Sequence, residues 1–95
     1  MNRRLVVRPL AWRELAETVD WYEAQRIGLG GKFIDSFQAA VDSIVQNPFH
    51  YQIVGRQTRR VALHRFPHGL MYSVSDEVIV VLSCFHSSRN PRWRK

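Results

Sequence analysis

Cysteine, lysine and long apolar runs are scarce in this chain of 95 residues. Its one cysteine, Cys84, can form no internal disulfide, which fits a reducing cytoplasm. No apolar run approaches about 18 residues, so we expect no membrane-spanning helix. The basic start is followed by an apolar stretch only from Leu5 to Val7, which is too short for the core of a signal peptide. These absences predict a cytoplasmic protein.

Metal-ligand and hydrolase motifs are also missing. The four histidines and the cysteine show no paired spacing such as Cys-x-x-Cys or His-x-x-x-His, so we expect no metal site and no cofactor. The chain has no Gly-x-Ser-x-Gly elbow, which disfavours a serine hydrolase. Gly28, Gly30 and Gly31 lack the spacing and the preceding strand of a phosphate loop, and we interpret them as a turn between two helices.

The composition predicts one small globular domain, residues 1–95, since 45% of the residues are hydrophobic. The formal net charge is +6, and 12 of the 14 cations are arginine. Guanidinium groups match phosphates and carboxylates, although a GC-rich genome would give the same arginine bias. Residues 10–48 have a net charge of −3 and the flanks carry +9. We therefore expect one strongly positive face, whose partner could be nucleic acid or an acidic protein.

The first half of the chain has the periodicity of a short strand and two helices. Residues 3–8 favour a strand, and Pro9 then precedes a helix over residues 10–25 with apolar positions three and four residues apart. A second helix is expected over residues 32–46, with Phe33, Phe37, Val41 and Ile44 on one face. Asn47 and Pro48 end it, and residues 48–58 are expected to form a loop.

The second half changes to the period of strands. We predict strands over residues 59–66, 70–74 and 78–85, with turns at 67–69 and 75–77. The last strand is apolar on both faces, which is typical of a strand inside a sheet. The predicted order is β-α-α-β-β-β. This is an α+β fold in which two antiparallel helices pack on one face of a small, mainly antiparallel sheet, and the first strand pairs with an edge of the final three-stranded meander.

The final ten residues combine one histidine, four cations and a tryptophan, which suits a grip on an anionic partner. Four stretches together carry a resemblance that spans almost the whole chain: Asp20-Trp21-Tyr22-Glu23, then Asn47-Pro48 before an aromatic loop, then residues 59–72 with their basic strand, Phe-Pro turn and Tyr72, and finally His86-Ser-Ser-Arg89-Asn90-Pro91-Arg92-Trp93. In these motifs and their order the chain resembles the RelE/ParE toxin superfamily of type II toxin–antitoxin modules, and most closely its ParE-like, plasmid-stabilisation branch.

The resemblance implies a toxin that forms a hetero-oligomer with a small, acidic cognate antitoxin. It also implies one of two activities. RelE-like members cleave messenger RNA in the ribosome without a metal, whereas ParE-like members poison DNA gyrase and have no known covalent chemistry of their own. A basic nucleic-acid-binding module without catalysis is a third possibility, which would need only the cationic flanks and rings such as Tyr72 and Trp93.

Cleavage of RNA by its 2′-hydroxyl needs a base, an acid and cations beside the phosphorane. His64 and His86 are the candidates for proton transfer, while Arg60, Arg65 and Arg89 could hold the phosphate. Each has an ordinary structural alternative. His64 fits a solvated strand position, His86 could pin the tail at a strand end, and the arginines could form a solvated face or an antitoxin contact.

Two departures from the RelE-like pattern favour the ParE-like activity. That branch uses lysines in its strand-forming half, whereas residues 33–94 contain none. It also tends to place a catalytic tyrosine near the C-terminus, where this chain has Trp93, which can stack but cannot exchange a proton. We therefore expect no catalytic residue. The residues expected to bind the target or the antitoxin are Arg59, Arg60, Arg65, Tyr72, Arg89, Arg92 and Trp93.

Overall fold

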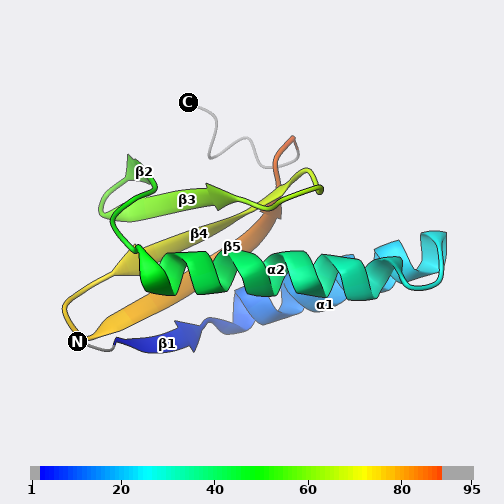
Figure 1. Ribbon diagram of the computed structural model, residues 1–95, viewed down its shortest axis with the longest axis horizontal. Coiled ribbons are helices and arrows are strands. Elements are labelled where there is room, and N and C mark those ends of the chain that lie inside the picture. Colours follow the sequence, from blue (N-terminus) through cyan, green and yellow to red (C-terminus); the bar gives the residue numbers. More distant parts are fainter. Residues whose placement is uncertain (1–2, 89–95) are drawn as a thin grey trace.

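Two helices lie against one face of a five-stranded sheet in the computed structural model, which describes residues 3–88 (Figure 1). The elements are β1 (Arg4–Val7), α1 (Pro9–Gln25), α2 (Leu29–Gln46), β2 (Gln52–Gly55), β3 (Thr58–Ala62), β4 (His68–Val74) and β5 (Val78–His86). The predicted α+β fold, with two antiparallel helices on a mainly antiparallel sheet, is confirmed. No helix within residues 3–88 is long and apolar enough to cross a membrane.

The sheet order is β1-β5-β4-β3-β2. β1 is parallel to β5, with Val6 opposite Val80, and the other neighbours are antiparallel. The first strand therefore pairs with an edge of the meander, as predicted. β5 has a partner on each side, which explains why its sequence is apolar on both faces.

β2 corrects the prediction of an unbroken loop over residues 48–58. It pairs with β3, with Gln52 opposite Arg60 and Ile53 opposite Arg59, and the register is irregular between Ile53 and Gly55. A four-residue edge strand is too short to show an alternating pattern, and its side chains lie mostly in solvent. Its stability comes from the neighbouring strand rather than from its own sequence.

The start of α2 corrects the assignment of all three glycines to a turn. Only Gly28, with φ of 91°, has a turn conformation, while Gly30 and Gly31 belong to the first turn of α2. Glu23 of α1 replaces a local cap, because its carboxylate accepts hydrogen bonds from the N–H of Gly28 at 2.9 Å and of Gly30 at 3.0 Å. These bonds satisfy donors that the start of a helix otherwise leaves free.

The β3–β4 connection is longer than predicted. β3 ends at Ala62 rather than at residue 66, and His68 and Gly69 belong to β4 rather than to a turn. The reason is local hydrogen bonding: the His68 carbonyl accepts from Leu63 N–H at 2.9 Å, and His68 N–H donates to Phe66 at 2.8 Å. The predicted alternation is nevertheless confirmed, with Leu63 buried and Ala62 exposed.

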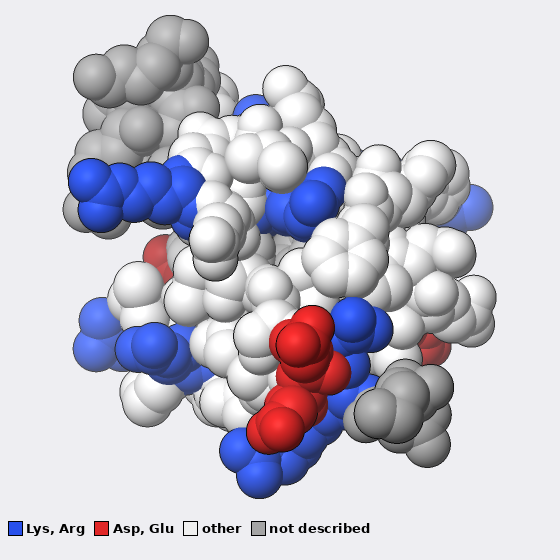
Figure 2. Space-filling view, turned by 90° about the vertical axis from the view of Figure 1, so that its left-hand side faces the viewer, with Lys and Arg blue, Asp and Glu red and all other residues white. Residues whose placement is uncertain are grey.

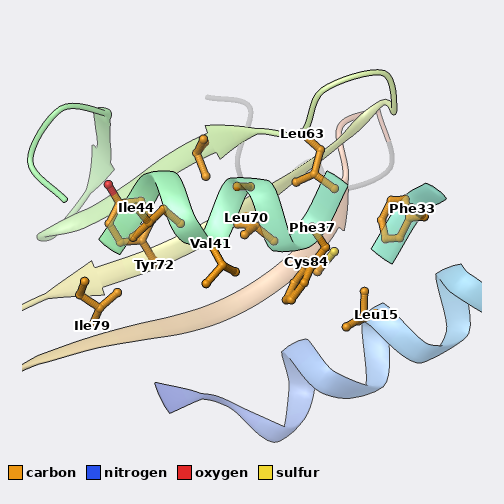
Figure 3. Close-up of a cluster of buried hydrophobic side chains, with 12 residues drawn as sticks. Leu15, Phe33, Phe37, Val41, Ile44, Leu63, Leu70, Tyr72, Ile79 and Cys84 are labelled. Atoms are coloured by element: carbon orange, nitrogen blue, oxygen red, sulfur yellow. The ribbon is translucent and has the colours of Figure 1, made fainter. Parts of the chain in front are cut away.

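The core lies between the helices and the sheet (Figure 3). Phe33, Phe37, Val41 and Ile44, the predicted face of α2, are all buried there. Their burial contributes roughly 6–12 kcal/mol before entropy is subtracted, at about 1.5–3 kcal/mol each. Tyr72 is fully buried among them. The helices are thus held on the sheet by ring and aliphatic packing rather than by charge.

Candidate functional site

The predicted contact cations that the structure describes do not gather on one surface. Arg59 and Arg60 are neighbours on β3, so they point to opposite faces of the sheet. Arg59 Nη1 donates to the carbonyls of Tyr51 at 2.7 Å and Phe49 at 3.2 Å. The guanidinium of Arg60 instead lies 5.3 Å from the Phe85 ring centroid. Arg59 therefore holds the loop before β2, while Arg60 covers a ring on the other face.

Two other described cations lie in different places. Arg65 is exposed in the β3–β4 connection with φ of 76°, and Arg3 lies over the Phe49 ring that Arg59 also contacts. In the view of Figure 2, Lys and Arg side chains form several separate groups around one acidic cluster. On the face shown there, the described cations do not form one continuous positive surface.

The two candidate histidines lie in different surroundings. His64 is exposed, and its carbonyl accepts a hydrogen bond from Ser36 Oγ at 2.7 Å. His86 ends β5, and its Nδ1 accepts from Ser88 N–H at 3.2 Å and lies 3.0 Å from Ser88 Oγ. Its ring centroid is 4.9 Å from that of His68. The ring of His86 is thereby fixed by the turn that follows β5, with Nδ1 already engaged as an acceptor.

A pocket of about 430 Å³ opens beside His86, between α1 and the end of β5. Its lining combines carboxylates, aromatic rings and imidazoles, from Glu14, Glu17, Thr18, Trp21, Tyr22, His68, Cys84, Phe85 and His86. Among the described residues, no arginine or lysine lines it. Of the five residues named for RNA cleavage, His86 lines this pocket, and Arg60, His64 and Arg65 do not, although the Arg60 guanidinium lies over the lining ring of Phe85. Arg89 is outside the described residues.

Glu14 is the best positioned of the charged groups in this pocket. Its Oε1 accepts from Ser83 Oγ at 2.8 Å and from Cys84 N–H at 2.9 Å, so the carboxylate is held between α1 and β5. Burial, together with the charge of Glu14, raises the pKa of the Cys84 thiol to about 12. Cys84 is therefore a thiol at neutral pH and a poor nucleophile.

Tyr72 has no accessible side-chain surface with which to contact a partner. It is 0% exposed, and its hydroxyl donates to the Pro48 carbonyl at 2.7 Å. Burial raises the pKa of Tyr72, against a smaller opposing effect of Arg59. The other three predicted contact residues, Arg89, Arg92 and Trp93, lie outside the described residues.

Glu14 and Glu17 were not predicted as site residues from the sequence. A signal was nevertheless present, because both residues precede Trp21 at helical spacing and share its side of α1. Trp21 was noted only as part of a motif. No signal within α1 indicates that Glu14 bonds to residues 69 and 70 positions later.

Comparisons with known proteins agree on one family. The family described as "ParE toxin of type II toxin-antitoxin system, parDE" matches the chain over residues 5–91. A solved structure titled "Chromosomal ParDE TA system from P. aeruginosa" is similar to it with a TM-score of 0.67 and 19% sequence identity, covering 88% of this chain and 95% of that chain. At that identity the likeness shows a shared fold. No curated protein matches the chain.

Proposed function

We propose that this chain, which belongs to the ParE toxin family of type II toxin–antitoxin systems, inhibits growth. It would do so by binding a protein target such as DNA gyrase. A small, acidic cognate antitoxin would neutralise it by forming a hetero-oligomer with it. This action places the toxin in the cytoplasm and needs no bond-making step by the toxin itself.

The charge of the pocket beside His86 is the observation that favours this proposal over RNA cleavage. A phosphorane needs cations close to it, since its negative charge grows in the transition state. Around His86 a phosphate would instead meet the carboxylates of Glu14 and Glu17. The described residues thus give little support to catalysis at this position.

Exposed aromatic rings supply surface for a protein target. Trp12 is 54% exposed on α1, and Trp21 and Phe49 are each 57% exposed. Large rings of this kind are enriched among the residues that dominate protein–protein affinity. Arg4, at the start of β1, and Arg65 are exposed cations that carboxylates of an acidic antitoxin could meet. Complementary charge of this kind guides association and selects the partner.

The experiment induces the toxin and then measures the supercoiling and cleavage of DNA alongside the integrity of messenger RNA. We expect gyrase-dependent cleavage complexes or loss of supercoiling, with messages intact. Ribosome-dependent cuts that His86→Ala abolishes would contradict the proposal. His50→Ala is the matched control, because His50 is an exposed loop histidine that does not line the pocket. Co-purification with the product of a short adjoining reading frame tests the antitoxin, and failure of any such product to bind would contradict that part.

A further inference from the structure

The pocket between α1 and the end of β5 has the opposite charge to the chain as a whole, whose net charge is +6. Glu14, Glu17 and Trp21 are three and four residues apart on α1, so they form one stripe along its surface. The bonds from Ser83 and Cys84 to Oε1 fix the Glu14 carboxylate in this stripe. The acidic character is therefore built into the contact between helix and strand.

The walls of the pocket suit a flat cation. Trp21 stands almost perpendicular to Tyr22, at 81° with ring centroids 5.1 Å apart, and Trp21 remains 57% exposed. A guanidinium can stack on an aromatic face and pair with a carboxylate at the same time, which an ammonium does less well. A pocket of about 430 Å³ holds one such side chain with room to spare.

We propose that this pocket binds an arginine side chain of the antitoxin, paired with Glu14 and Glu17 and lying against Trp21. The identity of the partner rests on the function proposed above, whereas the chemistry of the pocket does not. An antitoxin segment that reaches this pocket must then carry a basic residue, although the antitoxin is acidic overall. One residue of opposite charge in an acidic segment fixes the register of binding and rejects partners that lack it.

The chemistry is tested on the full-length toxin labelled with ¹⁵N. Nα-acetyl-L-arginine amide is titrated against its neutral, similarly shaped analogue, Nα-acetyl-L-citrulline amide. Saturable shifts of the Trp21 indole N–H and of amides near His86, with affinity in the millimolar range, are expected for the arginine compound only. Equal shifts with the citrulline compound, or no saturable shift at Trp21, would overturn the proposed chemistry.

Matched variants separate the pocket from general effects of charge and hydrophobicity. Glu14→Gln keeps an oxygen that can accept from Ser83 and Cys84 but removes the charge, and it should weaken arginine-amide binding by up to about fivefold, as expected for loss of an ion pair. Glu77→Gln makes the same change in the β4–β5 turn, at the other end of β5, and should have no effect.

A second matched pair tests the ring in the same titration. Trp21→Leu should weaken binding of the arginine amide, whereas Trp12→Leu should not, because Trp12 is equally exposed on α1 but does not line the pocket. Equal losses in both members of either pair would refute the site.

The antitoxin complex distinguishes this proposal from the proposed function. One arginine-to-glutamine change in the cognate antitoxin should weaken binding to the wild-type toxin but not to Glu14→Gln. If the antitoxin binds both toxins equally, the pocket proposal fails and the toxin–antitoxin assignment stands. If no antitoxin binds the wild-type toxin, the partner in both proposals is wrong.

Discussion

Gly30 and Gly31 are adjacent in the first turn of α2, yet alanine at the two positions should change stability in opposite directions. A Cβ at Gly30 would lie 2.9 Å from the Val19 carbonyl oxygen, 2.9 Å from Glu23 Oε1 and 3.1 Å from Val19 Cγ1. The same atom at Gly31 would meet nothing within 4 Å. Gly30→Ala and Gly31→Ala therefore test how closely α1 and α2 approach each other. The two variants make the same chemical change at adjacent positions.

The magnitude follows from which neighbour can move. The Val19 oxygen is backbone within α1, and Glu23 cannot turn aside without losing its bond to Gly30 N–H. Overpacking of this kind costs about 1–3 kcal/mol, and the lost hydrogen bond a further 0.5–1.5 kcal/mol or so. Removing a helical glycine returns at most about 1 kcal/mol. We therefore expect Gly30→Ala to lose about 1–3 kcal/mol and Gly31→Ala to gain about 0.5–1 kcal/mol.

Urea denaturation of both variants beside the wild type measures these differences, with helix content and tryptophan fluorescence as probes. At about 4–8 °C per kcal/mol for a domain of this size, the two melting temperatures should differ by at least about 6 °C. A Gly30→Ala protein as stable as the wild type would refute the close approach of the helices. Equal destabilisation by Gly31→Ala would show instead that the backbone of this turn, and not the contact, requires glycine.

Two further predictions concern buried polar groups. Tyr72→Phe leaves the Pro48 carbonyl without its donor and should lower the free energy of unfolding in urea by about 1–3 kcal/mol. Tyr51→Phe should cost less, because the Tyr51 hydroxyl is only partly buried beside Ser43. Equal losses of stability in the two variants would contradict the importance of burial. The Cys84 thiol has a pKa of about 12 against an ordinary 9.0, so its contribution to stability is present below pH 9 and is lost as the pH rises toward 12. Denaturation between pH 8 and pH 11 should show a decline of up to about 2.5 kcal/mol that Cys84→Ala lacks, and the same decline in that variant would assign it to other groups.

The helices could be predicted from sequence because their apolar periodicity is strong and their burial is large. Phe33, Phe37 and Val41 contact the core as their spacing indicates. The start of α2 could not be predicted, because two glycines locally favour a turn and only the contact with α1 makes them helical. Here a tertiary contact overrides local propensity. β2 was missed for the same reason, since its order derives from pairing with β3.

The candidate site was predicted less well, since its parts are distant in sequence. Counting cations suggested that Arg59 and Arg60 act together, although strand alternation already places them on opposite faces. Tyr72, in a motif that indicated a binding role, is a core residue. For His86, a structural role at the strand end was the alternative to proton transfer. Its Nδ1 accepts a hydrogen bond from Ser88 N–H, while residues 89–95 of the tail lie outside the described residues.

Glu14 connects the stability of the fold with the chemistry of its surface. Its carboxylate joins α1 to β5, raises the pKa of the Cys84 thiol and makes the pocket beside His86 acidic. The first role needs only an acceptor oxygen, whereas the other two need a charge. Glu14→Gln therefore separates them: if that variant stays folded but loses arginine binding, the charge serves recognition. A phosphate-cleaving site could use a carboxylate as a general base, but it also needs cations beside the phosphorane, and no arginine or lysine among the described residues lines this pocket. That lack is the structural reason to seek a protein partner at this end of the sheet.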